Sequence, residues 1–296
     1  MSKKKVLIIK HGSIGDIFMS FRTVNAVYSI YKNITICSTN NGLKTFDLLD
    51  FKFDKIVDRR SKNLFTNIYI IFKIISSDFD LVIDLQNSKR TSIYLLLLKI
   101  FSKTITNGTS KFATYTYKKA NFNEHAIQGL INQVKLLDIK VDNYHYYKTN
   151  RSILRQVVIV PGSSKKGLYK RWPIQNYLTI ISFLSSKNIK SIIIGGQDEE
   201  DIKNKIPNDN LIINLIGKSP WLEVKKLAQQ SIFAISNDTS AMHFISELNI
   251  PVIALMNDNR YSIRNYPLSK NSVLIKSKNI TDISIEKVLD EVKKFI

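Results

Sequence analysis

The sequence of 296 residues contains a single cysteine, Cys37, which excludes an intramolecular disulfide and a cysteine-based zinc site. It also lacks a long apolar run. The two most apolar stretches, residues 67–75 and 93–101, are each interrupted by lysine and are too short to span a bilayer. Residues 3–5 are lysines that lead directly into a short apolar strand, not into the core of a secretory signal. We therefore expect a protein of a reducing cytoplasm that does not cross a membrane.

The two apolar stretches leave two interpretations open. Helices packed on a sheet are the more common origin of such stretches. Contact with a membrane surface is the other, because their aliphatic and aromatic side chains could rest on lipid.

Acidic residues are scarce, with 24 Asp and Glu against 44 Lys and Arg, which gives a formal net charge of +20. Such an excess indicates an anionic partner, and nucleic acid, anionic lipid and phosphorylated metabolites all qualify. Lysines scattered over solvated faces without any ligand are the alternative. The apolar fraction of 44% is large enough for two folded domains of ordinary size, so disorder is not expected.

Short β-branched runs alternate with longer helical patterns, which predicts parallel sheets covered by helices. Strands are expected at residues 6–10, 34–38, 55–59, 81–86, 104–108, 157–162, 191–196, 211–217, 232–238 and 252–256. The polar stretch 140–156 is the expected linker. The pattern predicts an α/β fold of two doubly wound Rossmann-like domains, residues 1–150 and 151–296. The C-terminal helix is a candidate for packing back on the first domain.

In doubly wound sheets, ligands bind beyond the carboxyl ends of the strands. Five loops stand in that position: "KHGSIGD" (10–16), "DLQNSKR" (84–90), "PGSSKKGLYKRWP" (161–173), "GGQDEE" (195–200) and "SNDTSAMH" (236–243). None matches the G-x-G-x-x-G or Walker A pattern. No acid ends the second strand either, so a dinucleotide oxidoreductase is disfavoured.

The acid of the first loop, Asp16, follows a glycine turn that allows the backbone to approach a substrate closely. A carboxylate placed there suits a general base, because an alcohol is a poor nucleophile until its proton is removed. An ordinary N-terminal helix residue, favoured by the helix dipole, is the alternative.

A nucleotide leaving group develops negative charge that a metal or fixed cations and amides must stabilise. Metal-dependent glycosyltransferases typically bind the metal with a D-x-D pair. The pattern "DFD" at 78–80 stands at the amino end of an expected strand, which is the wrong end for a ligand site. Ser163, Ser164 and Lys170 after the sixth strand offer hydroxyls, amides and a point charge. Within the same loop, Lys165, Lys166 and Arg171 remain alternatives to Lys170.

The loop "SNDTSAMH" ends a strand and begins a helix, so the amides of Thr239, Ser240 and Ala241 are expected to face an anion. The same residue types are ordinary N-caps. His243 is a ligand contact or a core histidine, with equal support. Glu199 suits a sugar or ribose hydroxyl, with a first-turn helix acid as the alternative.

Basic and polar residues follow the third and fourth strands, and an Arg/Lys pair suits a phosphorylated or carboxylated sugar. These candidates for acceptor binding are Arg59, Arg60, Gln86, Ser88, Lys89 and Arg90.

Taken together, the five loops resemble the heptosyltransferase family of bacterial lipopolysaccharide synthesis, glycosyltransferase family nine. "HGSIGD" resembles its G-S-x-G-D turn, and the other loops resemble its D-L-x-x-S-x-R, P-G-[AS] with K-R-W-P, GG-x-x-E and N-D-[TS]-x-x-M-H elements. The sequence departs from the family pattern at Ser240, usually glycine, and at Ala241, commonly proline. In addition, "ALMNDNRYS" (254–262) replaces a G-P-T turn. These departures surround the donor pocket and bear on the sugar nucleotide more than on the reaction type.

The resemblance implies a GT-B fold and an inverting, metal-independent glycosyltransferase without a cofactor. Heptose would move from a nucleotide diphosphate sugar, with ADP-heptose favoured, to the lipopolysaccharide core or a related surface glycan. The acceptor, an anionic glycolipid, would bind the first domain, with peripheral contact at the inner face of the inner membrane. Asp16 and Lys170 would be catalytic. Donor contacts would come from Ser163, Ser164, Glu199, Asp238, Thr239, Ser240, Met242 and His243, and acceptor contacts from Ser13, Arg60, Gln86, Ser88, Lys89 and Arg90.

The resemblance also divides the donor contacts by chemistry. Asp238 would contact hydroxyls of the donor sugar, Thr239 and Ser240 the diphosphate, and Met242 the nucleoside pocket.

Two rival functions remain. A basic nucleic-acid-binding protein would need clustered cations with interleaved aromatics on one element. The nearest stretches, residues 112–122 and 142–148, show neither strand alternation nor a helical period. A glycosyltransferase with a different donor sugar is the second.

Overall fold

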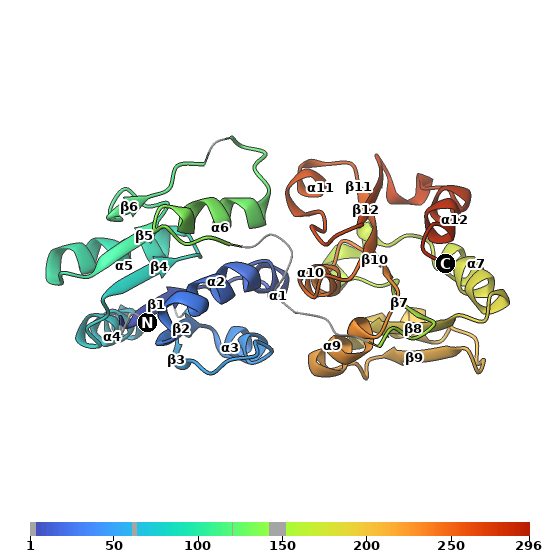
Figure 1. Cartoon of the computed structure of the whole chain (residues 1–296), viewed down its shortest axis with the longest axis horizontal. Coiled ribbons are helices and arrows are strands. Elements are labelled where there is room, and N and C mark those ends of the chain that lie inside the picture. Colours follow the sequence, from blue (N-terminus) through green and yellow to red (C-terminus); the bar gives the residue numbers. More distant parts are fainter. Residues whose placement is uncertain (1–3, 61–63, 120, 142–151) are drawn as a thin grey trace. The chain divides into compact units, whose positions relative to one another are not determined.

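The structure, a computed structural model, describes residues 4–60, 64–119, 121–141 and 152–296 (Figure 1). The chain divides into two compact units, Met1–Asn143 and Tyr144–Ile296. The expected domain boundary and most of the expected linker lie outside the described residues.

The first unit is built on a six-stranded parallel sheet in the order β3-β2-β1-β4-β5-β6. Its strands are β1 (Val6–Ile9), β2 (Ile34–Ser38), β3 (Asp54–Val57), β4 (Leu81–Asp84), β5 (Ile105–Gly108) and β6 (Tyr115–Thr116). The first five lie where the β-branched runs predict them. The sequence did not predict β6, because it is only two residues long and pairs at the sheet edge through Asn107 and Gly108.

Helices cover both faces of this sheet because its crossovers run in opposite directions from β1, and parallel crossovers are almost always right-handed. One face carries α1 (Ile14–Phe18), α2 (Phe21–Tyr31), α3 (Asn40–Phe46) and α6 (Ala126–Lys135), while the other carries α4 (Leu64–Ser76) and α5 (Lys89–Phe101). On the second face, Ile74 of α4 and Leu98 of α5 join Leu7, Ile9 and Val82 of the strands in one buried cluster.

The second unit repeats this architecture, with a parallel sheet in the order β12-β11-β10-β7-β8-β9. Its strands are β7 (Gln156–Val160), β8 (Lys190–Gly195), β9 (Ile212–Ile216), β10 (Ala234–Asn237), β11 (Val252–Asn257) and β12 (Val273–Ser277). The helices are α7 (Ile174–Ser186), α8 (Glu200–Lys203), α9 (Trp221–Gln229), α10 (Ser240–Glu247), α11 (Arg260–Asn265) and α12 (Ile285–Lys293). The sequence did not predict β12, an edge strand of which only Ile275 is buried.

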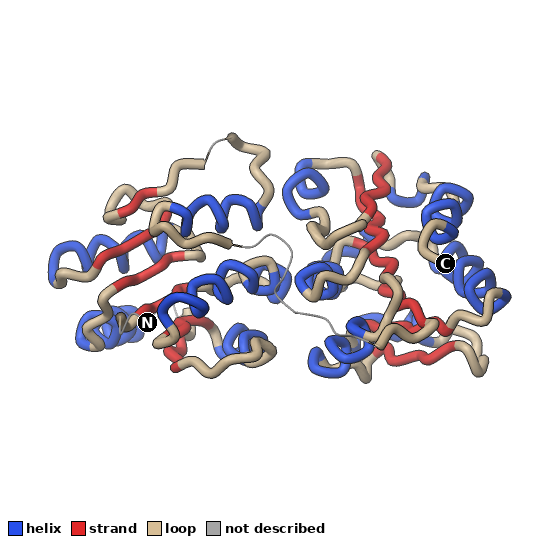
Figure 2. The backbone as a smooth tube through the Cα atoms, viewed as in Figure 1, coloured by secondary structure: helices blue, strands red, loops and turns tan. Residues whose placement is uncertain are grey.

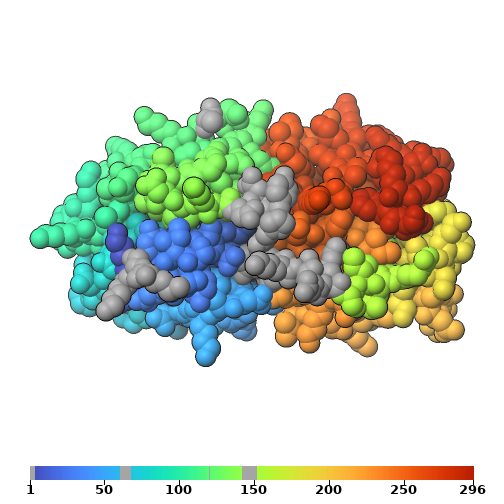
Figure 3. Space-filling model, in the orientation of Figure 1, coloured from blue at the N-terminus to red at the C-terminus, as the bar shows by residue number. Residues whose placement is uncertain are grey.

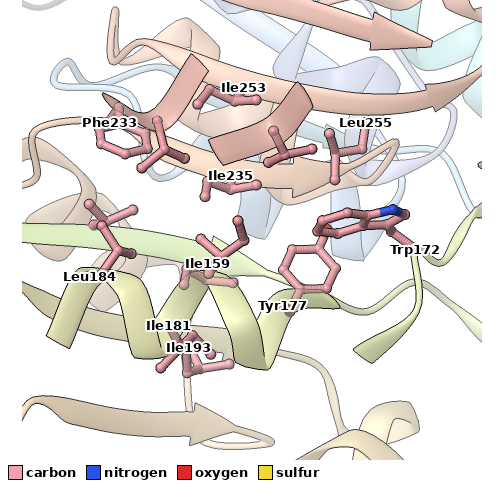
Figure 4. Close-up of a cluster of buried hydrophobic side chains, with 14 of the residues drawn as sticks. Ile159, Trp172, Tyr177, Ile181, Leu184, Ile193, Phe233, Ile235, Ile253 and Leu255 are labelled. Atoms are coloured by element: carbon pink, nitrogen blue, oxygen red, sulfur yellow. The ribbon is translucent and has the colours of Figure 1, made fainter. Parts of the chain in front are cut away.

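The core of the second unit gathers side chains from the sheet and from α7, α8 and α12 (Figure 4). Trp172 packs edge-to-face on Tyr177 with ring centroids 5.1 Å apart, and its indole Nε1 donates to the carbonyl of Ile283 at 2.8 Å. Val288 and Val292 of α12 belong to this cluster. The C-terminal helix therefore packs its apolar side on its own unit.

Both sheets place the first and fourth strands of their unit side by side, and this pair is the switch point of a doubly wound sheet. The pairs are β1 with β4 and β7 with β10 (Figure 2). The loops that the sequence singled out follow these strands. By contrast, Asp80 of "DFD" precedes β4, and its Oδ2 accepts from the amide of Lys5 at 2.7 Å. The structural interpretation of "DFD" is confirmed.

Among the described residues, no helix is long and apolar enough to cross a membrane.

We predict that Ile159→Ala lowers the free energy of unfolding by about 2–5 kcal/mol, because Ile159 is fully buried in β7 and the surrounding sheet cannot collapse around the cavity. Ile213→Ala on the edge strand β9 is the matched control, since Ile213 is 36% exposed. Urea titration of both variants measures the difference. An equal loss in the two variants would contradict the assigned core.

Candidate active site

The turn after β1 presents Asp16 at the surface of the first unit. Gly12 has a φ of 106°, a left-handed conformation that favours glycine, and Ser13 caps α1. Oδ2 of Asp16 accepts from the Ser13 amide at 3.1 Å and from its hydroxyl at 2.8 Å. Oδ1 takes part in none of the described hydrogen bonds of this residue. Asp16 thus takes part in the cap of α1 through Oδ2, while Oδ1 of its exposed carboxylate could accept a proton. The structure is therefore compatible with both interpretations, a helix-capping acid and a general base.

The loop after β4 is fastened to this turn. The His11 amide donates to Oε1 of Gln86 at 2.9 Å, and Nζ of the buried Lys10 donates to the carbonyl of Leu85 at 3.2 Å. The carbonyl oxygen of the Gln86 side chain, a predicted acceptor contact, is therefore already used to hold the two loops together.

Asp58 binds several polar and charged groups at the carboxyl ends of the strands of the first sheet, although the sequence did not single it out. Its fully buried carboxylate accepts from Arg90 Nη2 at 2.8 Å, from Tyr94 Oη at 2.9 Å and from the Arg60 amide at 2.8 Å, and His11 Nε2 lies 3.2 Å away. Burial alone would raise the pKa of Asp58, but these hydrogen bonds hold it well below its usual range. In the sequence Asp58 falls within the expected strand at residues 55–59, whereas in the structure it directly follows β3.

Asp58 also decides which predicted acceptor residues are open to a ligand. The guanidinium of Arg90 is committed to Asp58, and the Ser88 hydroxyl caps α5 by accepting from the Thr91 amide at 3.2 Å. Arg60 and Lys89 keep exposed side chains. The structure therefore leaves these two cations facing solvent and gives Arg90 and Ser88 structural contacts.

A second carboxylate at this edge, Asp84, is completely buried at the end of β4. Burial raises its pKa to about 6, although its Oδ1 accepts from the amides of Gln86 and Asn87 at 3.0 Å each. Burial lowers the pKa of neighbouring Lys10, and the carboxylates of Asp16 and Asp84 act in the opposite direction.

One group of potential metal ligands lies beneath the same turn. Single atoms of His11, Cys37 and Asp58 lie within 4.8 Å of one another, and all three residues are buried. Metal binding at such a site requires a thiolate and free carboxylate oxygens. Burial raises the pKa of the Cys37 thiol well above its usual value, and both oxygens of Asp58 already accept hydrogen bonds. These residues do not fit a metal centre.

In the second unit, the loops after β7, β8 and β10 converge on a cavity of about 450 Å³. Five predicted donor residues line it: Ser163, Ser164, Glu199, Thr239 and Ser240. The sequence did not single out Ile194, Ser219, Trp221 and Val224, which line it as well. Met242 does not line it, because its side chain is fully buried. Trp221, whose ring meets Phe244 edge-to-face, supplies an aromatic wall instead.

The loop after β7 is held in shape by its own polar contacts. The buried Ser163 hydroxyl donates to the carbonyl of Gly167 at 2.7 Å, and Arg171 donates to the Ser163 carbonyl at 2.7 Å and pairs with Asp201 at 3.0 Å. Arg171 thus supports the loop, and Ser163 lines the cavity while its hydroxyl bonds the loop. Ser164, Lys165 and Lys166 are exposed.

Lys170 and Asp238 form an ion pair of 2.6 Å between the end of this loop and the end of β10. The pair is largely shielded, with side-chain exposures of 28% and 12%, and His243 Nε2 lies 3.8 Å from the other carboxylate oxygen. The Thr239 hydroxyl accepts from the Met242 amide at 3.3 Å and so caps α10. The structure thus brings Lys170, Asp238 and His243 together beside the N-terminus of α10.

Glu199 lies in the cavity wall against two glycines. A Cβ at Gly162 or Gly195 would collide with its carboxylate, so a larger residue at either position would require the Glu199 side chain to move. Burial raises the pKa of Glu199 to about 7, although the Gly196 amide donates to Oε2 at 2.8 Å and Arg171 acts in the same downward direction. A carboxyl group with this pKa exchanges its proton near neutral pH.

Comparison with known proteins decides the family. Residues 70–293 match the model of glycosyltransferase family 9 (heptosyltransferase). The chain belongs to this family. The predicted family is confirmed, and four of the five loops lie within the matched residues, while the turn that presents Asp16 precedes them.

Curated relatives of this family member include lipooligosaccharide heptosyltransferase 2 of Haemophilus influenzae, 23% identical over 218 residues, which are 63% of each chain. The enzyme of the same name from Haemophilus ducreyi is 23% identical over 241 residues, 70% of this chain and 69% of the relative. The alignment thus spans less than two thirds of the first relative.

Solved structures match nearly the whole chain. E. coli heptosyltransferase WaaC with ADP has a TM-score of 0.78 at 15% identity, covering 99% of this chain and 100% of that one. A family 9 glycosyltransferase from Veillonella parvula has a TM-score of 0.76 at 16% identity, covering 99% and 97%. The predicted fold of two Rossmann-like domains of the GT-B type is confirmed.

The titration of Glu199 predicts a pH-dependent stability. The unfolded chain releases the proton near the ordinary value of 4.5, whereas the folded chain keeps it up to about pH 7. Over this range the unfolded state binds fewer protons, so the free energy of unfolding falls as pH rises and levels off above pH 7. We expect Glu199→Gln to flatten this fall between pH 6 and 7.

Thermal melts of the nucleotide-free protein measure the effect. Asp84, with a pKa of about 6, contributes a similar fall at lower pH, so only the interval from pH 6 to 7 is diagnostic. Asp290→Asn, at an exposed acid of α12, is the control and should keep the fall. Parallel profiles of wild type and Glu199→Gln in this interval would show that Glu199 does not titrate there.

Proposed function

We propose that this family member transfers a sugar, most simply heptose, from a nucleotide diphosphate sugar to the hydroxyl of an anionic glycan acceptor. The observation that carries the proposal is the cavity in the second unit, on which loops from three strand ends converge. It combines an aromatic wall, hydroxyls, helix amides and a nearby ion pair, which together suit a nucleoside diphosphate.

Each part of the proposed donor has a residue of the cavity or of its surroundings that could contact it. Trp221 offers its ring to the base, and the Glu199 carboxyl offers a hydrogen bond to a ribose hydroxyl. The amides of Ser240 and Ala241 open α10 toward the diphosphate, and Lys170 adds a positive charge. ADP-heptose is the proposed donor, since the structures of the E. coli relative were solved with ADP and with ADP-2-deoxy-2-fluoro heptose.

The proposed transfer inverts the anomeric centre. Asp16 accepts the proton of the acceptor hydroxyl as the acceptor oxygen forms its bond to the anomeric carbon. The bond from that carbon to the β-phosphate oxygen breaks, and the electron pair leaves with the nucleoside diphosphate. Lys170 and the amides of α10 stabilise the charge that develops on this leaving group. No metal or cofactor takes part in this scheme.

On the acceptor side, three exposed cations lie close in sequence to the ends of β3 and β4: Arg59, Arg60 and Lys89. We assign them to the anionic groups of a lipopolysaccharide core or a related surface glycan. Such an acceptor is a lipid, and we therefore place the enzyme at the cytoplasmic face of the inner membrane.

A different donor sugar is the second candidate. Ser240 and Ala241 line the cavity where the family pattern has glycine and proline. In addition, Asn259 caps α11 after β11 by accepting from the amides of Tyr261 and Ser262. Comparing the melting-temperature shifts caused by ADP, GDP and UDP identifies the nucleotide. Stabilisation by none of them, with sequence-dependent nucleic-acid binding at physiological salt, would favour the rival basic nucleic-acid-binding function.

Asp16→Asn is expected to reduce transfer at least about a hundredfold while nucleotide binding stays unchanged. Asparagine keeps an oxygen that can accept from Ser13 and so preserves the helix cap, but it cannot take the acceptor proton. Transfer assays with ADP-heptose and melting shifts with ADP measure the two effects. Asp290→Asn, at an exposed acid of α12, is the control. A near wild-type rate for Asp16→Asn would remove this residue from the mechanism.

Transfer is also expected to survive EDTA, because Lys170 and helix amides supply the positive charge that a metal would supply. Rates are compared before and after chelation, with magnesium or manganese added back. Activity that is lost in chelator and restored by either ion would overturn the role of Lys170, and Lys170→Ala should weaken ADP binding if that role is correct.

A further inference from the structure

Two helices of the first unit expose large apolar side chains where surface helices ordinarily carry polar ones. We call this surface the α4–α5 patch. It consists of Ile68, Tyr69 and Phe72 of α4 and Ile93, Ile100 and Phe101 of α5, each between 53% and 67% exposed. Exposed apolar residues are normal when scattered singly, but a contiguous group marks an interaction site.

The patch is continuous because of how the two helices lie. Both cover the same face of the sheet and contact each other, with Ile74 and Leu98 directed into the common core. The exposed residues repeat at intervals of three, four and seven, so they occupy the opposite, outward side of each helix. Packing on the sheet accounts for the apolar residues on the inner side of each helix, but not for those on the outer side. In Figures 1 and 3 the segment of α5 reaches the outer margin of the first unit.

The helices of the patch carry charges of one sign. Neither α4 nor α5 contains an aspartate or glutamate, while Lys73, Lys89 and Lys99 lie on them. Beyond the helix ends, Asp78 follows α4 and Lys103 follows α5. Apolar rings with lysines and without acids are suited to the interface of an anionic bilayer, where rings enter the headgroup region and ammonium groups meet phosphates. Two copies joined symmetrically through the patch would instead set lysines against lysines.

The position of the patch fits a lipid acceptor. Ser88 caps α5, Lys89 is its first residue, and Phe101 is its last. With a rise of about 1.5 Å per residue, the 13 residues of α5 span roughly 20 Å. One helix therefore connects the proposed acceptor residues with the apolar patch.

We propose that the α4–α5 patch is the surface through which this protein binds an anionic membrane. The inference rests on the proposed function, in which the acceptor is an anionic glycolipid held by the first unit. The patch would keep the acceptor loop at the depth where lipid headgroups lie.

Sedimentation with vesicles tests the proposal. At physiological ionic strength, the wild type should bind vesicles of equal parts phosphatidylglycerol and phosphatidylcholine and should not bind pure phosphatidylcholine. Phe72→Ser with Phe101→Ser should weaken this binding at least about tenfold, since two rings no longer leave water. The matched control, Leu222→Ser with Tyr261→Ser, removes two residues of 56% and 58% exposure from the second unit and should bind as the wild type does.

Three results would overturn the proposal: no preference for the anionic vesicles, equal binding by the patch variant, or a dimer in vesicle-free solution that the patch variant alone abolishes. The last would identify the patch as an interface between copies. The proposed function is tested separately, by the melting shift with ADP and by transfer to a lipid-free saccharide acceptor. Neither should change in the patch variant, so failure of the docking surface and failure of the enzyme assignment are distinguishable.

Discussion

The side-chain amide of Asn237 holds the donor site together. It is completely buried, donates to the carbonyl of Pro161 at 2.8 Å, and accepts from the Tyr177 hydroxyl at 2.8 Å and the Trp172 amide at 3.3 Å. These bonds fasten the end of β10 to the loop after β7 at the switch point of the sheet. Without Asn237, the Tyr177 hydroxyl would be left buried and unpaired, which is costly. The cavity and the pair of Lys170 with Asp238 depend on this junction, because both are built from the two segments it joins.

In the first unit, a buried carboxylate instead of a neutral amide joins the loops at the strand ends. Asp58 lies beside His11 of the loop after β1, and it accepts from the Arg60 amide after β3 and from Arg90 of α5. A buried carboxylate is tolerated only when its partners satisfy it, so His11, Arg90 and Tyr94 are required by the fold before any substrate arrives. The basic residues that remain for an acceptor are those this network does not use.

The sequence predicted the sheets well because a fully buried parallel strand tends to be a continuous apolar run, as "VLII" (6–9) and "VVIV" (157–160) are. It failed for β6 and β12, where edge position removes that requirement. It located the loops that form the sites, because topology places them at strand ends. It did not single out Asp58, because the expected strand at residues 55–59 included it. It did not find Trp221 and expected Met242 to line the pocket, because which side chain turns outward in the first helical turn depends on packing that has no local signature. The capping motifs were equally ambiguous, since the same residues cap a helix and face a ligand.

The excess positive charge of the chain lies mainly outside its core. Among the described residues, the buried carboxylates Asp58, Asp84, Glu199 and Glu247 are nearly balanced in number by the buried basic groups Lys10, Arg22 and Lys225. The interior formed by the described residues is therefore close to neutral, and most of the net charge of +20 is carried outside it. Surface charge alone attracts any polyanion and falls off within a Debye length of about 8 Å at physiological salt. What can select a membrane among polyanions is apolar area next to that charge, and α4 and α5 combine the two on helices that carry no acid.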